Sequence, residues 1–178
     1  MIGVVVAELR ALVLGGGKGT RMNSSVPKLL HKICGKSMIS WVVDSVSSAG
    51  VEKVLIVTSP QLSDSDEIHQ MSASLIAQDI PLGTGHALLQ ARSELESFDG
   101  NWLIVNGDTP AIRPESFSSL IQQHESSGAF ITVMTSHDPF NENMGLISRE
   151  HDTDDIIAIL EYGDKDYDVN DSSEFNVG

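Results

Sequence analysis

The chain has 178 residues, of which 40% are hydrophobic, so it is long enough for one domain with a substantial core and short for two. Its formal net charge of -14 disfavours nucleic acids and anionic membrane surfaces as partners, because both would be repelled. Cys34 is the only cysteine, which excludes an intramolecular disulfide and favours a reducing, cytoplasmic location. The apolar stretch 2–7 is interrupted by Glu8 and Arg10, so neither a signal peptide nor a membrane span is predicted.

The first elements are predicted from one apolar run and one capped segment. Residues 9–14, which end in the apolar run Ala11-Leu12-Val13-Leu14, predict a buried strand, and a long loop is predicted to follow it. Ser37 is a good N-terminal cap for a helix over 38–49, and Gly50 stands where a left-handed residue commonly ends a helix.

The rest of the chain continues an alternation of strands and helices. The predicted elements are strands over 53–58, 74–77, 102–105 and 130–134, helices over 63–73 and 84–95, a helix from Pro114 to just before Gly128, and a hairpin of 145–149 with 156–161. This order predicts an α/β fold, a Rossmann-like and mostly parallel sheet flanked by helices, with a C-terminal β-hairpin region.

Ligands of such sheets bind at the carboxyl ends of the strands. The rule places three segments at one edge of the predicted sheet: the glycine-rich residues 15–17, residues 78–84, and Asp108. We therefore expect the functional site at this edge.

A basic segment lies next to the glycines. Residues 10–43 contain no acidic side chain and six basic ones, namely Arg10, Lys18, Arg21, Lys28, Lys32 and Lys36. Glycines let backbone N–H groups approach phosphate oxygens, and Lys and Arg supply the opposite charge. The segment predicts a site for a small anionic ligand; a chance run of charges on a solvated loop is the alternative.

The glycine loop matches neither the G-x-x-x-x-G-K-[ST] nor the G-x-G-x-x-G template, because Gly19 follows Lys18 and Thr20 takes the last glycine position. It reads G-G-G-K-G-T-R-M and is followed by Pro27-Lys28; later come L-G-T-G-H-A from Leu82 and N-G-D-T-P from Asn106. The set resembles sugar-phosphate nucleotidyltransferases, and among them the uridylyltransferase domain of the bacterial N-acetylglucosamine-1-phosphate uridylyltransferases (the GlmU family).

The resemblance implies a role for each matching position. Arg21, Lys28 and Asp108 would be catalytic. The nucleotide would be held by Leu14, Gly15, Gly16, Gly17, Lys28, Gln78, Gly83, Thr84, Asn106 and Gly107, with Gln78, Gly83 and Thr84 reading uracil. Gly145, Glu161 and Asn176 would hold the sugar and ribose.

Asp108 would be the ligand of Mg²⁺, the implied cofactor. Mg²⁺ suits one carboxylate, since phosphates and water complete its octahedral shell. An Asp after a strand is also a common turn former, and that alternative stays open. Among other metal candidates, His31, Cys34 and His86 lack partners at ligand spacing, which favours core or surface roles.

The expected function is the joining of UTP and N-acetylglucosamine 1-phosphate to give UDP-N-acetylglucosamine and pyrophosphate, a step of cell-wall precursor synthesis. Two alternatives stay open: another base or sugar phosphate, and a nucleotide-binding domain without turnover. The second depends on the expectation that 1–178 form a single nucleotidyltransferase domain, shortened at its C-terminal end before a second metal ligand of the family and without the acetyltransferase β-helix. A monomer or weak oligomer is expected.

Overall fold

The structure is a computed structural model that describes residues 8–17, 22–137, 144–153, 155–161, 163–164 and 174–177. The chain forms two compact units, Met1–Ile121 and Gln122–Gly178. The prediction of a single nucleotidyltransferase domain stays a prediction, and each unit is described by itself.

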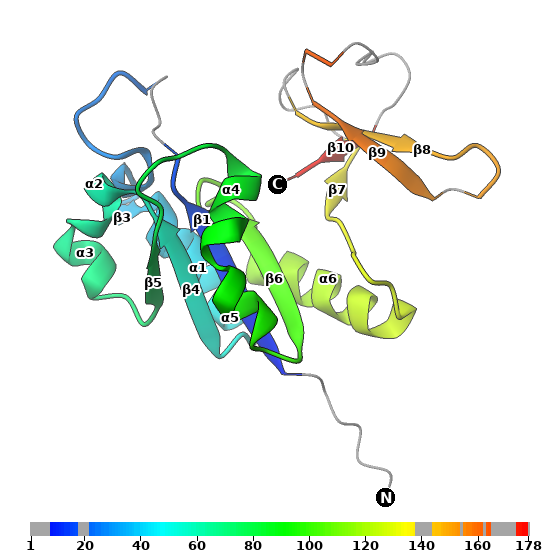
Figure 1. The fold of residues 1–178 in the computed structure, drawn as a ribbon, viewed down its shortest axis with the longest axis horizontal. Coiled ribbons are helices and arrows are strands. Elements are labelled where there is room, and N and C mark those ends of the chain that lie inside the picture. The colour runs from blue at the N-terminus through cyan, green and yellow to red at the C-terminus, as the bar shows by residue number, and fades with distance from the viewer. Residues whose placement is uncertain are drawn as a thin grey trace, which may run out of the picture. The chain divides into compact units, whose positions relative to one another are not determined.

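A four-stranded parallel sheet organises the first unit (Figure 1). Its strands are β1 (Leu9–Gly15), β4 (Lys53–Thr58), β5 (Ser74–Ala77) and β6 (Asn101–Asn106), in the order β5-β4-β1-β6. The central strands β1 and β4 carry continuous apolar runs, at 11–14 and 54–57, because both faces of the sheet are covered; Leu12 and Ile56 are fully buried. The predicted α/β fold is confirmed, and the strands over 53–58 and 74–77 have the predicted bounds.

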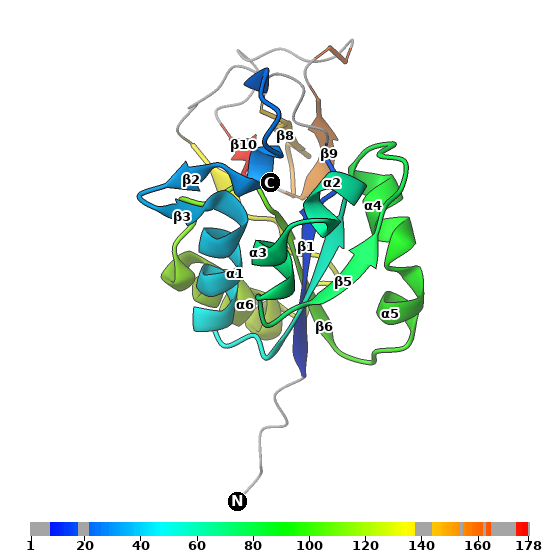
Figure 2. The same cartoon turned by 90° about the vertical axis from the view of Figure 1, so that its left-hand side faces the viewer.

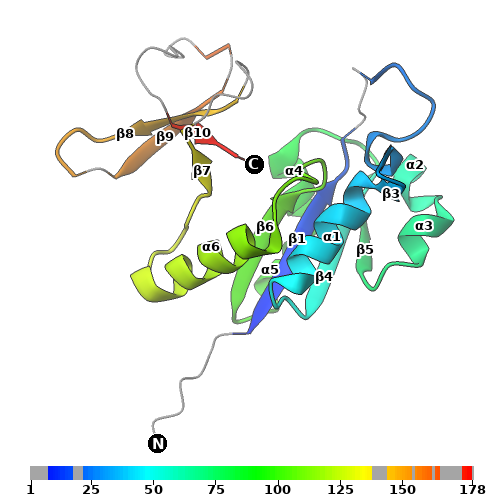
Figure 3. The same cartoon turned by 180° about the vertical axis from the view of Figure 1, so that it is seen from behind.

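Helices cover both faces of this sheet (Figures 2 and 3). On one face lies α1 (Met38–Ser48), capped as predicted by the Ser37 hydroxyl, which accepts from the Ser40 N–H, and followed by Gly50 at φ 96°. On the opposite face lie α4 (Thr84–Gln90) and α5 (Arg92–Glu96). A single helix over 84–95 was predicted, but the backbone leaves helical geometry at Ala91, where ψ is 5°.

The shorter elements of the first unit are η2 (Lys28–Leu30), β2 (Lys32–Ile33), β3 (Lys36–Ser37), α2 (Pro60–Ser63) and α3 (Asp66–His69), and α6 (Pro114–Ser127) runs across the division between the units. The predicted helix over 63–73 is wrong. Pro60 starts a helix earlier, because its ring presets helical φ, and Ser65 interrupts it. The two short helices bury Leu62 and Ile68.

The second unit contains an antiparallel sheet of β7 (Thr135–Ser136), β8 (Leu146–Arg149), β9 (Ile156–Leu160) and β10 (Phe175–Asn176), in the order β7-β10-β8-β9. Pairing of β8 with β9 confirms the predicted hairpin. The predicted strand over 130–134 is wrong, since the side chain of Phe130 is 97% exposed and the sheet begins only at Thr135.

Candidate functional site

The strand order of the first unit creates a crevice beside β1. The chain leaves β1 toward β4 and β5 and then returns to the other side of β1 as β6. Connections that diverge in this way open a crevice at the carboxyl ends of the strands, where ligands of such sheets bind. The glycine loop after β1 and the turn Asn106-Gly107-Asp108 after β6 border this point, which we call the switch crevice.

Three of the glycines at this site are closely packed. A Cβ on Gly15 would lie 2.8 Å from the backbone oxygen of Val57, and one on Gly16 would lie 1.6 Å from Oε1 of Gln78. A Cβ on Gly107 would lie 3.1 Å from the backbone oxygen of Leu14, which accepts a hydrogen bond of 2.9 Å from the Gly107 N–H. The predicted nucleotide-binding positions Leu14 and Gly107 are thus joined to one another by the backbone.

Gly17 differs from its neighbours and allows a matched stability test. No atom lies within 4 Å of a Cβ built on Gly17, whereas Gly15 faces a backbone oxygen that cannot rotate away. We expect Gly15→Ala to lower the free energy of unfolding by about 1 to 3 kcal/mol through overpacking. Gly17→Ala should leave it unchanged or raise it by less than about 1 kcal/mol. Urea unfolding measures both; equal stabilities for the two variants would contradict the packing argument.

Lys28 and Asp108 meet in this region although 80 residues separate them. Lys28 belongs to η2, after Pro27, and Asp108 follows β6 directly. The Lys28 Nζ donates to Oδ2 of Asp108 at 2.5 Å, and the two side chains are 36% and 38% exposed. The pair joins two predicted catalytic residues, one a cation suited to phosphate and the other a carboxylate suited to a hard metal ion.

Gln78 follows β5 and points back toward the glycine loop. Its backbone N–H donates to the Thr58 oxygen at 2.8 Å, and the residue is 1% exposed. The side-chain amide packs over Gly16 and lies 2.9 Å from Nδ1 of His86. A predicted base-reading side chain is therefore held between the glycine loop and α4.

Gly83 and Thr84 lie at the start of α4 and are exposed. Gly83 has φ 106°, a left-handed conformation that glycine adopts without strain, and no atom lies within 4 Å of a Cβ built on it. Asn106 is half-buried at the end of β6, and its carbonyl accepts from the Thr109 hydroxyl at 2.8 Å, which closes the turn before Pro110. Arg21 lies outside the described residues.

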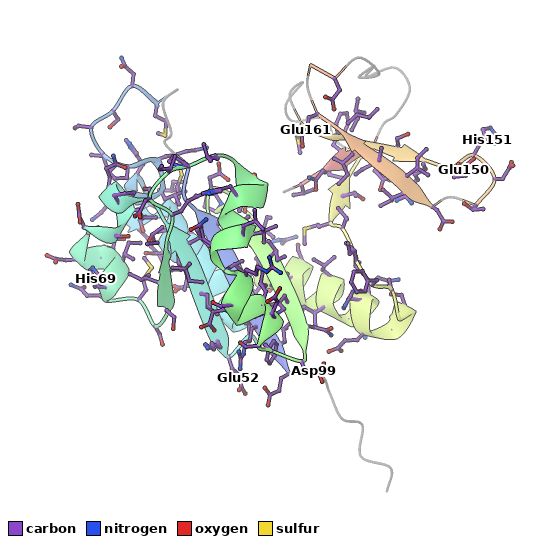
Figure 4. All side chains as sticks on the ribbon, in the orientation of Figure 1. Glu52, His69, Asp99, Glu150, His151 and Glu161 are labelled. Atoms are coloured by element: carbon purple, nitrogen blue, oxygen red, sulfur yellow. The ribbon has the colours of Figure 1, made fainter. Side chains whose placement is uncertain are left out.

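The three predicted sugar-binding residues come together in the second unit. The Asn176 N–H donates to the Gly145 oxygen at 2.7 Å. A Cβ on Gly145 would lie 3.4 Å from Oε1 of Glu161 and 3.6 Å from Cβ of Asn176. Glu161, labelled in Figure 4, is exposed, and its backbone N–H donates to Asp164. The roles of these residues in sugar binding stay predictions.

A charged cluster beside them was not anticipated from the sequence. Arg149 donates to both carboxylate oxygens of Glu174, from Nε at 2.6 Å and from Nη2 at 2.9 Å, and the Thr135 hydroxyl donates at 2.5 Å. The Arg149 hydrogen bonds above all lower the pKa of Glu174 from its ordinary value of 4.5 to about 2, although burial opposes this shift. The cluster ties β8 and β7 to the residue that precedes β10.

We expect Glu174→Gln to lower the free energy of unfolding by about 2 kcal/mol near neutral pH, because it removes the negative charge from a partly buried ion pair with Arg149. The folded-state pKa is depressed, so the carboxylate stabilises the fold above its unfolded pKa and the contribution is lost as pH falls toward about 2. The difference between parent and variant in urea unfolding should narrow with acidification.

The matched control for this pH series is Glu96→Gln. Glu96 accepts from Arg92 at 2.6 Å on the surface of α5, where both side chains are more than half exposed. Its loss should change stability by less than about 0.5 kcal/mol. A gap between parent and Glu174→Gln that stays constant with pH would contradict the ion-pair account.

The residues that sequence reasoning missed are polar partners of the predicted ones. His86 was given a core or surface role but contacts Gln78, while Gln90 lies one helical turn after His86 and reaches its other ring nitrogen at 3.2 Å. The spacing of His86 and Gln90 was the available signal, because side chains four apart on a helix are neighbours. Arg149 and Glu174 gave no such signal, since 25 residues separate them.

Within the described part of the chain, no group of three or more His, Cys, Asp or Glu side chains is placed to hold a metal ion. Among the described helices, none has the length and apolar character that crossing a membrane requires.

Comparison with known proteins gives consistent matches. The family model described as "MobA-like NTP transferase domain" matches residues 11–166. The chain is 36% identical over 157 residues to the Bifunctional protein GlmU of Lactobacillus delbrueckii subsp. bulgaricus, and the aligned region covers 88% of this chain and 34% of that protein. It is 38% identical over 174 residues to the Bifunctional protein GlmU of Syntrophotalea carbinolica, covering 96% of this chain and 37% of that protein. The chain thus spans about a third of the length of these curated relatives.

Solved structures share the fold. UDP-glucose pyrophosphorylase complexed with UDP-glucose superposes with a TM-score of 0.74 and 20% identity, over 95% of this chain and 74% of that one. A nucleotidyl transferase from Methanothermobacter superposes with a TM-score of 0.55 and 24% identity, over 65% of this chain and 57% of that one. From the family match over most of its length, the chain belongs to the MobA-like NTP transferase domain family.

Proposed function

We propose that the protein is a nucleotidyltransferase that joins UTP and N-acetylglucosamine 1-phosphate to give UDP-N-acetylglucosamine and pyrophosphate. The observation that carries the proposal is the meeting of Lys28 and Asp108 at the switch crevice, beside the tightly packed glycine loop. The preference for this base and sugar is supported by the motifs shared with the GlmU family and by the relatives of that name.

The chemistry is a displacement at phosphorus. An oxygen of the sugar 1-phosphate attacks the α-phosphorus of UTP, and the bond to the pyrophosphate breaks with its electron pair. A phosphate monoester has a second pKa near ~6, so the attacking oxygen is already deprotonated at neutral pH and needs no protein base. The protein's task is to hold two anions together, and Lys28 with the loop N–H groups supplies the opposing charge.

Mg²⁺ fits the donor set of the crevice. The Asp108 carboxylate is a hard oxygen ligand that is partly exposed, and one such ligand suits an ion that takes its other ligands from phosphates and water. When bound, Mg²⁺ would neutralise charge on the phosphates. Lys28, now paired with Asp108, would then be released toward the nucleotide.

A pyrophosphate-release assay tests the proposal. The protein is given UTP, Mg²⁺ and N-acetylglucosamine 1-phosphate, with omission of each in turn, and with CTP, dTTP or glucose 1-phosphate as substitutes. Release that requires all three components and prefers UTP supports the proposal. Calorimetric binding of UTP without release supports the alternative of a nucleotide-binding domain without turnover, and preference for another base or sugar supports the other alternative. A protein that binds no nucleotide would overturn all three.

A further inference from the structure

A line of three polar side chains runs from the glycine loop along α4. The Gln78 amide nitrogen lies 2.9 Å from Nδ1 of His86, and the Gln90 side-chain amide lies 3.2 Å from Nε2 of the same ring. Gln78 is 1% exposed, and its Oε1 packs over Gly16. No described residue donates a hydrogen bond to that oxygen. With respect to the described residues, this oxygen is an acceptor available at the glycine loop.

The ring nitrogens of His86 fix which way the Gln78 amide points. A neutral imidazole has one donor and one acceptor nitrogen, and an amide nitrogen can only donate. Both amide nitrogens face the ring, and a neutral ring can accept from only one of them. Gln78 is buried whereas Gln90 is exposed and free to turn over, so we assign Nδ1 as the acceptor from Gln78, place the ring proton on Nε2, and let Gln90 present its oxygen to that proton. With the ring proton on Nε2, turning the Gln78 amide over would set its oxygen against the Nδ1 lone pair, which costs a hydrogen bond in a buried place.

We propose that His86 is a positioning residue that sets the pyrimidine selectivity of the protein, by holding Gln78 with Oε1 and one N–H available to the base. The inference rests on the proposed function, in which Gln78 reads the nucleobase. His86 needs no contact with the nucleotide, because it acts through the orientation of an amide.

The orientation matters because uracil and cytosine present opposite edges. Uracil offers an N3–H donor between two carbonyl oxygens, whereas cytosine offers an N3 acceptor beside an amino donor. A free amide pairs with either base by turning over, since it donates at one end and accepts at the other. An amide whose oxygen is fixed toward N3 accepts a hydrogen bond from the N3–H of uracil. In cytosine, N3 is itself an acceptor, so the amide oxygen and N3 repel one another. Fixing the amide thus converts a permissive side chain into a selective one.

Two substitutions separate this role from simple packing. His86→Phe keeps a planar ring but removes the acceptor. His86→Asn places Oδ1 as many bonds from the backbone as Nδ1, so it keeps an acceptor for Gln78. Binding of UTP and of CTP is measured for parent and variants by calorimetry in the presence of Mg²⁺, with a thermal melt as the folding control.

We expect the preference for UTP over CTP to fall about tenfold in His86→Phe, through weaker UTP binding and stronger CTP binding. In His86→Asn it should stay within about threefold of the parent. In a Gln78→Leu background, His86→Phe should have no further effect on the preference, because the two residues act as one unit.

The outcomes distinguish this inference from the proposed function. A parent that binds UTP and CTP equally would overturn the uracil assignment itself. A selective parent together with an equally selective, folded His86→Phe would overturn only the role of His86.

A second measurement needs no variant protein: long-range ¹H–¹⁵N NMR of the parent at neutral pH should find the His86 ring proton on Nε2. A proton at Nδ1 would overturn the inference, because that nitrogen could not accept from Gln78.

Discussion

Replacing Lys28 by alanine should weaken UTP binding by about tenfold to a hundredfold, and slow any turnover at least as much. The expectation follows from the strength of a charge-assisted hydrogen bond to phosphate, roughly 1.5 to 3 kcal/mol. Lys28 is held by η2 with its Nζ at Asp108, in the switch crevice next to the glycine loop. Calorimetric titration of UTP into the parent and the variant measures the effect.

Lys53→Ala is the matched control. Lys53 is the first residue of β4, so it lies at the amino ends of the strands, whereas the glycine loop lies at their carboxyl ends. Its Nζ lies 3.4 Å from Glu94 in an exposed ion pair. The control removes the same charge and also breaks an ion pair, so a general electrostatic effect would weaken UTP binding in both variants. Equal affinities for Lys28→Ala and the parent would remove Lys28 from the site.

The charges of the first unit explain why the position of a cation matters in so acidic a protein. Glu52 and Asp99 lie where β4 and β6 begin, far from the carboxyl ends of the strands (Figure 4). The described part of the glycine-loop region, by contrast, carries Lys28 and no acidic residue before Asp44. Asp108 offsets the charge of Lys28 in the absence of a metal ion, so the attraction of an anion to the crevice depends on releasing Lys28 from this pair.

The sequence predicted the sheet well, and for a physical reason. Residues 54–57 are buried on both faces of the sheet and form a continuous apolar run, so the strand over 53–58 could be bounded from composition alone. The edge strand over 74–77 is only partly buried, and its bounds were predicted from its short apolar centre. The short helices after β4 were missed, because each depends on one local feature, the ring of Pro60 or the interruption at Ser65. Residues 130–134 have strand-forming side chains, but strand formation also needs a partner strand and burial, and Phe130 has neither in the described structure.

The site was predicted as a set of positions but not as a set of contacts. The rule on carboxyl ends brings Gly16, Gln78 and Asp108 to one edge once the strands are known. The sequence does not say which strands are neighbours. Lys28 comes after β1 and Asp108 after β6, and the pairing of these two strands brings the side chains together across 80 residues. The orientation of Gln78 depends on a side chain eight residues away across a loop, a spacing with no periodic signal.

Asp108→Asn should change UTP binding in opposite directions with and without Mg²⁺. Without the metal, Asp108 occupies Lys28 and repels the triphosphate, so removal of its charge should strengthen UTP binding by about threefold to tenfold. With Mg²⁺ present, the variant lacks the carboxylate that is proposed to hold the ion, and UTP binding should be weaker than in the parent. Metal and nucleotide raise each other's affinity by the same factor, so this coupling factor should fall by about tenfold or more, together with turnover.

Glu94→Gln supplies the control, because Glu94 of α5 forms an ion pair with Lys53 at the start of β4, and its loss removes the same charge and frees a lysine away from the carboxyl ends of the strands. UTP affinity is measured by calorimetry with Mg²⁺ and with EDTA in all three proteins, and a thermal melt establishes that each is folded. The sign reversal is the informative part of the test, since a loss of folding would weaken binding under both conditions. If the UTP affinity of folded Asp108→Asn depends on Mg²⁺ as strongly as that of the parent, Asp108 is a turn residue that pairs with Lys28, and the proposed metal site is wrong.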